Sequence, residues 1–246
     1  MDFKQPPVVR ISRDTTGGAE NGSAGAEPGS AYPFSIPAVA QLLAEGLTLD
    51  PGMTFLVGEN GSGKSTILEG IALAFGFAPE GGSIHSQHST WPSESDLYTR
   101  LYIQRGIGTK RWGFFLRSET THSLYTYLEE VSPGTGLHQM SHGESYLELF
   151  SDYFSRPGFY CMDEPEAALS FGSTLRLLRI LDQIRSAGGQ ALIATHSPIL
   201  ASLPGATVIE VGDWGMRQVQ WRDLELVDHW CRYLQAPERY LRHLLD

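Results

Sequence analysis

A glycine-rich segment with one lysine is the strongest chemical signal in the sequence. It fits the pattern G-x-x-x-x-G-K-[ST] and contains Gly58, Glu59, Asn60, Gly61, Ser62, Gly63, Lys64 and Ser65, followed by Thr66. Glycines let successive backbone N–H groups turn toward phosphate oxygens, and the N-terminus of a following helix adds its positive dipole end. The pattern therefore predicts a phosphate-binding loop in which Lys64 contacts the β- and γ-phosphates of ATP and Ser65 binds Mg²⁺.

Two adjacent acidic residues follow an apolar run of strand length. The run is residues 159–162, and the acids are Asp163 and Glu164. Neighbouring side chains on an extended strand point to opposite sides, so the two carboxylates are expected to have different roles. We expect Asp163 to hold Mg²⁺ through water and Glu164 to act as the general base for the attacking water. Without the phosphate loop, a strand that runs into an acidic turn would be the simpler interpretation.

A third candidate, His196, follows the apolar run 191–194 in a polar Thr-His-Ser cluster. Ligands of open α/β sheets bind at the carboxyl ends of the strands, so His196 is expected to contact the γ-phosphate and orient the water. A lone histidine at a strand end is more often structural, and the order of the motifs favours catalysis here. By contrast, His85 and His88 lack a third ligand and are interpreted as solvent-exposed.

The elements that must position these residues alternate between strands and helices. Strands are expected at residues 8–12, 53–57, 97–104, 111–117, 158–162, 190–194, 207–211 and 216–221. Helices are expected at residues 38–45, 65–75, 143–154 and 173–187, and from 223 onward with a break near Pro237. This order predicts an α/β fold with a mostly parallel central sheet and antiparallel strands at one side. Hairpins are expected between residues 97–104 and 111–117 and around residues 212–215.

Length and composition fit one domain over residues 1–246. Residues 14–30 are rich in Gly, Ser, Ala and Glu and are expected to form a flexible loop, while residues 120–155 are expected to form a small lobe. The formal net charge of −10 disfavours nucleic acid and anionic lipid as partners. Two cysteines, Cys161 and Cys231, imply no disulfide framework, and no apolar run approaches the roughly 20 residues of a membrane span. A cytoplasmic protein is expected.

In their order along the chain, these motifs resemble those of the ABC ATPase superfamily. Residues 58–65 resemble its Walker A motif, and residues 159–164 resemble Walker B with the catalytic glutamate. Residues 168–170 are similar to the D-loop, with Ser170 in place of the usual Asp, and His196 matches the switch histidine. The resemblance implies the fold of that superfamily, with ATP and Mg²⁺ as ligands.

A signature-like segment supports the same resemblance. Ser141 and Gly143 match the signature motif, while His142 and Glu144 stand where Gly and Gln are usual. The resemblance implies a head-to-tail homodimer in which Ser141, Gly143 and Glu144 of one subunit close over the γ-phosphate held by Lys64 of the other. ATP would bridge the subunits and hydrolysis would release them. Shorter matches over nearly the whole chain are similar to small stand-alone ATPases of the AAA/ABC type.

Two family features have alternative positions in this sequence. The glutamine loop falls either at Gln104 or at the end of the strand near residues 117–119, where no glutamine occurs. The aromatic residue that stacks on adenine would be Tyr32 or Phe34, upstream of the phosphate loop.

Four functions are compatible with the motifs. The favoured one is a stand-alone ATPase that acts as a dimerising switch on an unknown partner. A nucleotide-binding subunit of an ABC transporter, attached to the membrane only through a separate chain, is the main alternative. The short segment between Lys64 and Ser141 and the altered signature count against it. A DNA-repair-type ATPase would have coiled-coil arms, for which the sequence has no heptad run, and Glu164 disfavours a nucleotide sensor without hydrolysis.

Overall fold

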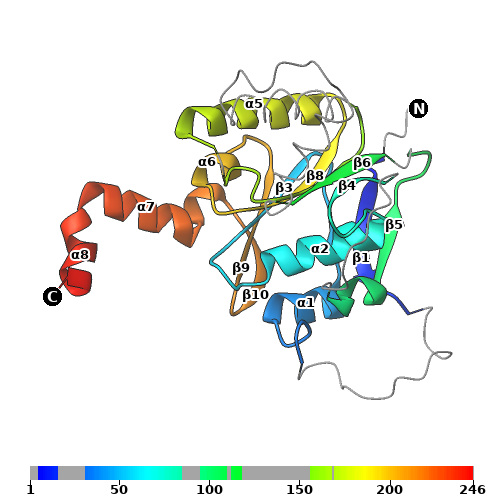
Figure 1. The fold of residues 1–246 in the computed structure, drawn as a ribbon, viewed down its shortest axis with the longest axis horizontal. Coiled ribbons are helices and arrows are strands. Elements are labelled where there is room, and N and C mark those ends of the chain that lie inside the picture. The colour runs from blue at the N-terminus through cyan, green and yellow to red at the C-terminus, as the bar shows by residue number, and fades with distance from the viewer. Residues whose placement is uncertain are drawn as a thin grey trace.

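Two β-sheets form the framework of the protein. The computed structural model describes residues 5–15, 31–84, 95–109, 112–117, 156–167 and 169–245. The strands are β1 (Val8–Arg13), β2 (Leu47–Thr48), β3 (Met53–Val57), β4 (Gly82–Ser83), β5 (Leu101–Arg105), β6 (Gly113–Leu116), β7 (Phe159–Asp163), β8 (Gln190–Thr195), β9 (Thr207–Gly212) and β10 (Gly215–Val219). A seven-stranded sheet has the order β10-β9-β3-β8-β7-β6-β4, and a three-stranded sheet has the order β2-β1-β5 (Figure 1).

Helices cover both faces of the larger sheet. The α-helices are α1 (Pro37–Glu45), α2 (Lys64–Phe75), α5 (Phe171–Ser186), α6 (Pro198–Ala201), α7 (Glu225–Gln235) and α8 (Pro237–Leu245), and 3₁₀ turns span Asp96–Arg100 and Trp221–Asp223. In Figure 1, α1 and α2 lie on one face and α5 lies on the other, while α7 and α8 extend away from the body at the C-terminal end. Among the described residues, every helix is too short or too polar to cross a bilayer.

The central strands run parallel, as the alternation of strands and helices predicted. β3 pairs in parallel with β8 and β9, and β7 pairs in parallel with β6 and β8. The antiparallel strands lie at both edges, β10 beside β9 and β4 beside β6, whereas the sequence predicted them on one side only. The β9–β10 hairpin and the break between α7 and α8 at Pro237 confirm two further predictions.

One predicted hairpin is wrong. The sequence suggested that residues 97–104 and 111–117 pair with each other, but β5 pairs antiparallel with β1 in the smaller sheet. β6 instead pairs in parallel with β7 in the central sheet. A short polar connection therefore carries the chain from one sheet to the other. The predicted helix at residues 143–154, the small lobe at 120–155 and nearly all of the loop at 14–30 lie outside the described residues.

Alternation along the buried strands divides the core into two layers. In β3, Leu56 packs in the layer that contains α1 and α2, while Phe55 and Val57 pack in the layer that contains α5. The period of two follows from the pleat, and a strand with helices over both faces is apolar throughout. This explains why all five residues of β3 are buried.

Local sequence sets the limits of the two helices nearest the strand ends. α2 stops at Gly76, whose φ of 109° is left-handed and suits glycine at a helix C-terminus. α5 begins after Ser170, whose side chain accepts a hydrogen bond from the backbone N–H of Ser173. Serine is a preferred N-cap because its oxygen satisfies an N–H group that the helix leaves unpaired.

A buried glutamine joins the two sheets. Gln190, only 1% exposed at the start of β8, accepts a hydrogen bond from the Val8 N–H at 2.8 Å. Its amide nitrogen donates to the Val8 carbonyl at 2.8 Å and to the Asp50 carbonyl at 3.0 Å. The side chain therefore satisfies backbone groups of β1 and of the turn before β3 at the same time.

Replacing Gln190 with alanine is expected to lower the free energy of unfolding by about 2–3 kcal/mol, because it leaves these buried backbone groups without partners. Urea denaturation followed by circular dichroism measures the change. Gln218→Ala, at an exposed position of edge strand β10, is the matched control and should shift stability by less than about 0.5 kcal/mol. An unchanged urea midpoint for Gln190→Ala would show that other contacts hold β1.

Candidate nucleotide site

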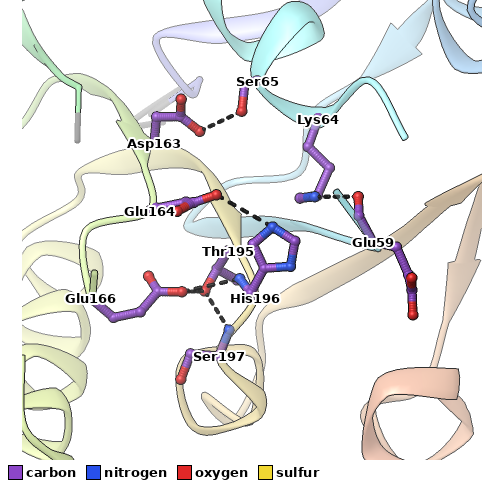
Figure 2. Close-up of polar contacts among 9 residues, drawn as sticks. All are labelled: Glu59, Lys64, Ser65, Asp163, Glu164, Glu166, Thr195, His196 and Ser197. Carbon is purple, nitrogen blue, oxygen red and sulfur yellow. Dashed lines mark hydrogen bonds and ion pairs between the residues drawn. The ribbon is translucent and has the colours of Figure 1, made fainter. Parts of the chain in front are cut away.

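The register of three parallel strands brings the predicted site residues to one edge of the sheet. Val57 at the end of β3 pairs with Thr195 at the end of β8, and Asp163 at the end of β7 pairs with Ala194. The phosphate loop, the acidic pair and His196 therefore all start from the same level of the sheet. Figure 2 shows Lys64 and His196 near each other at this edge.

The phosphate loop connects β3 to α2, as the sequence predicted, and two of its glycines are required by their surroundings. Gly63 has a φ of 100°, and a Cβ there would lie 2.6 Å from the Ile36 side chain. At Gly58 a Cβ would lie 2.1 Å from the Val211 carbonyl oxygen. The loop therefore packs closely between the residue before α1 and the end of β9. A side chain in place of either glycine would displace the loop.

Lys64 is the first residue of α2 and its side chain points into the loop. The residue is 4% exposed, and its Nζ donates to the Glu59 carbonyl oxygen at 2.8 Å (Figure 2). Burial lowers the pKa of the Lys64 ammonium, while the negative charges of Glu164 and Asp163 act in the opposite direction. This ammonium is held over the loop where an anionic phosphate would bind.

Ser65 and Asp163 form the pair of oxygen ligands predicted for a metal. Ser65 Oγ donates to Asp163 Oδ1 at 2.9 Å (Figure 2). Burial raises the pKa of the Asp163 carboxyl to about 6, although the Ser65 hydrogen bond lowers it. A desolvated carboxylate beside a hydroxyl fits Mg²⁺, which binds one or two protein oxygens together with substrate phosphates. Among the described residues, no cluster of three or more His, Cys, Asp or Glu could hold a metal by itself.

Glu164 and His196 face each other across the ends of β7 and β8. Glu164 Oε1 lies 3.3 Å from His196 Nε2 (Figure 2). Glu164 has a φ of 45°, and its N–H donates to the Ala194 carbonyl at 2.9 Å. Burial lowers the pKa of His196, and the Lys64 charge lowers it further. A neutral imidazole forms no strong ion pair with the Glu164 carboxylate. The carboxylate is therefore available to accept a hydrogen bond from a water molecule.

Glu166 belongs to the site, although the sequence analysis gave it no role. Its Oε1 accepts hydrogen bonds from the Thr195 hydroxyl and from the His196 N–H, the latter at 3.0 Å. The Thr195 Oγ1 in turn accepts from the Ser197 N–H at 2.9 Å. Glu166 thus fixes the backbone that carries His196. Its place two residues after Glu164, in the same acidic turn, was the only signal in the sequence.

The structure separates the two candidates for the adenine-stacking residue. Tyr32 is 69% exposed, and its hydroxyl lies 3.4 Å from Thr66 Oγ1 at the start of α2. Phe34 packs against the buried core instead. Of these two candidates, Tyr32 is therefore the one with an exposed ring beside the phosphate loop.

The two candidates for the glutamine loop also lie in different places. Gln104 is exposed on β5, in the three-stranded sheet, whereas Arg117 follows β6 directly beside β7. Arg117 forms an ion pair with Glu69 of α2 at 3.0 Å. The structure therefore brings Arg117, rather than Gln104, to the edge that carries Asp163.

Some predicted residues cannot be compared with the structure. Ser141, Gly143 and Glu144 of the signature-like segment lie outside the described residues, as do His85, His88 and Ala168 of the D-loop-like segment. Ser170 is described and caps α5.

A hollow opens beside the phosphate loop. Its volume is about 870 Å³, within the range of sites that bind small molecules. Residues 57–62 and His196 line one side, and Trp214 of the β9–β10 turn and Trp230 of α7 line the other. The Glu210 carboxylate holds this second side by accepting from the N–H group at the start of α7 and from Arg217.

Comparisons with known proteins agree with this geometry. Two family models match, one described as "AAA domain, putative AbiEii toxin, Type IV TA system" over residues 88–202 and one described as "AAA domain" over residues 41–111. The chain is 27% identical over 192 residues to the ribose import ATP-binding protein RbsA 1 of Burkholderia cenocepacia, covering 66% of this chain and 37% of that protein. It is 28% identical over 189 residues to the cytochrome c biogenesis ATP-binding export protein CcmA of Rhizobium etli, covering 65% and 85%. Together, the family models and the ATP-binding relatives support a P-loop ATPase of the ABC type, at low identity.

Among solved structures, the chain is also similar to the SMC head domain from Thermotoga maritima. That match has a TM-score of 0.42 and 16% identity, and covers 71% of this chain and 93% of that chain. The matches to the RbsA relatives span only about a third of their length, 37%. Both relatives are named as ATP-binding proteins. The import and export in their names are properties of those whole proteins, which extend beyond the matched part.

Glu166→Ala is expected to lower the free energy of unfolding by about 2 kcal/mol, because Thr195 and the His196 N–H lose a buried acceptor. Hydrogen exchange at the His196 amide should become faster, and mass spectrometry of peptides from this region measures it. Glu238→Ala, at an exposed position of α8, is the control and should change neither quantity. Unaltered exchange at His196 in Glu166→Ala would contradict the positioning role of Glu166.

Proposed function

We propose that this protein hydrolyses ATP with Mg²⁺ and that ATP binding joins two copies head to tail. The observation that carries the proposal is the convergence of Lys64, the Ser65–Asp163 pair and the Glu164–His196 pair at the carboxyl edge of β3, β7 and β8. Each group has the chemistry that a different part of a bound nucleotide and its attacking water requires. The ATP-binding relatives support the same substrate.

The triphosphate would bind along the loop and the N-terminus of α2. Backbone N–H groups and the helix dipole favour the negative charge, and the Lys64 ammonium would exchange the Glu59 carbonyl for β- and γ-phosphate oxygens. Ser65 and Asp163 would hold Mg²⁺, which neutralises charge on the phosphates when it is bound. Tyr32 stands where an aromatic ring could stack on the adenine.

Glu164 and His196 would act on the water. Glu164 would accept a hydrogen bond from the water that attacks the γ-phosphate, and His196 would orient the same water or the γ-phosphate. Because Glu166 holds the backbone of His196, and Ala194 holds the backbone of Glu164, the backbone that carries each side chain would be in place before substrate arrives. Fixed groups lose little freedom in the transition state, which favours catalysis.

A transporter subunit is the second candidate, and it is favoured by the similarity to RbsA and CcmA, which are named as import and export proteins. In that case the same ATP-driven closure would act on a separate membrane chain. Purification of the ATP-bound protein with its native partners would distinguish the two. An integral membrane protein recovered at stoichiometric yield supports transport, and self-association without one supports the stand-alone ATPase.

Lys64→Ala is expected to weaken ATP binding by at least about 100-fold, because the buried ammonium lies at the loop and a charged hydrogen bond to phosphate is lost. Isothermal titration calorimetry with ATP measures this. Arg222→Ala, an exposed cation before α7, is the control and should leave the affinity unchanged. Equal affinity in Lys64→Ala and the parent protein would remove the phosphate-loop assignment.

Glu164→Gln is expected to leave ATP affinity within about threefold and to reduce turnover by about 10²–10⁴, because an amide cannot accept the proton of the attacking water. Phosphate release measures turnover. With MgATP the variant should accumulate as a dimer in light scattering, since binding persists and hydrolysis does not separate the subunits. Turnover close to that of the parent would exclude Glu164 as the base, and a monomer at saturating MgATP would contradict the head-to-tail closure.

A further inference from the structure

We infer that Arg117 is a γ-phosphate sensor, which leaves its ion pair with Glu69 and contacts the triphosphate when ATP, but not ADP, is bound. This inference rests on the proposed function, because it concerns the same nucleotide site. Arg117 would place a cation just after β6, where the superfamily resemblance would place a glutamine.

The strand pairing puts Arg117 beside the metal-binding pair. β6 runs parallel to β7, and Leu116 at its end pairs with Met162. The next residue along the chain is therefore Arg117 directly after β6 and Asp163 at the end of β7. Adjacent strands are separated by only about 4.8 Å, so the two side chains start from neighbouring positions at the same edge.

Two side-chain contacts join α2 to the ends of β6 and β7. Ser65 on α2 bonds Asp163 at 2.9 Å, and Glu69 on α2 bonds Arg117 at 3.0 Å. Ser65 and Glu69 are four residues apart, so they share one face of the helix and are separated by one turn, about 6 Å. The residues of α2 that bond Asp163 and Arg117 are therefore neighbours on one face of the helix.

The ion pair with Glu69 can be exchanged. The side chains of Arg117 and Glu69 are 21% and 17% exposed, so the pair is partly open to solvent rather than enclosed in the core. Arg117 Nη1 also donates to the Pro79 carbonyl at 2.6 Å, while Nη2 bonds Glu69, so one terminal nitrogen keeps its partner when the other changes. Arginine binds phosphate in a two-pronged geometry, and a γ-phosphate carries more negative charge than one carboxylate. ADP lacks this group, so it would leave the Glu69 pair intact.

The test compares affinities for ATP and ADP by isothermal titration calorimetry, with Glu164→Gln as the parent so that ATP persists. Arg117→Gln should weaken ATP binding about 10-fold and leave ADP binding unchanged, because only the γ-phosphate loses a charged donor. Glu69→Gln should raise the preference for ATP over ADP about threefold, because the competing carboxylate is gone. The double variant Glu69→Gln/Arg117→Gln should have the same preference as Arg117→Gln alone.

Two further variants separate sensing from a structural role. Arg117→Lys keeps the charge without the fork and should give an intermediate preference, which also covers the case that Arg117→Gln does not fold. Arg105→Gln is the control, since Arg105 bonds the Phe75 carbonyl at the other end of α2, and it should change neither affinity.

An unchanged ATP-to-ADP preference in both Arg117→Gln and Arg117→Lys would overturn the inference while leaving the proposed function intact. Equal weakening of ATP and ADP, or effects of Glu69→Gln that persist without Arg117, would overturn it as well and make the ion pair structural. A parent that binds neither nucleotide would overturn the proposed function together with the inference.

Discussion

The common register of β3, β7 and β8 is the constraint on which the site depends. Because these strands are parallel and end at one level, three connections that are far apart in the chain meet over a few ångströms. The pairing of Val57 with Thr195 and of Asp163 with Ala194 sets the positions of the residues that follow. A shift of one residue in any of these strands would exchange its two faces and turn the functional side chains away. The two apolar layers that fix this register therefore also fix the chemistry.

Much of the site could be predicted because its signals are local. The phosphate loop, the acidic pair and His196 each occupy a few consecutive residues, and their order along the chain resembles that of the ABC ATPase superfamily. The contacts of Glu166 and Arg117 could not be predicted, because their partners are 30 and 48 residues away. The same limit explains the wrong hairpin. From local sequence alone, two adjacent strand-like segments are expected to pair with each other. In the folded protein β5 pairs with β1, and β6 pairs with β7.

Helix α2 carries more of the site than its motif indicates. Its first turn holds Lys64 and Ser65, and Tyr32 approaches it at Thr66. One turn later, Glu69 reaches the end of β6. A single rigid element thus contacts the parts proposed to bind adenine, phosphate and metal, so these parts keep their spacing when the surrounding loops adjust.

The backbone conformation at Glu164 is unfavourable for stability, at a residue whose side chain is proposed to act in catalysis. A φ of 45° is unfavourable for a residue with a Cβ by about 1 kcal/mol, and the bond from its N–H to Ala194 maintains that conformation. Glycine would adopt it without strain, but without the carboxylate that the proposed reaction requires. A strained residue is typical of functional sites, where the surrounding structure maintains a conformation that the side chain alone would not favour.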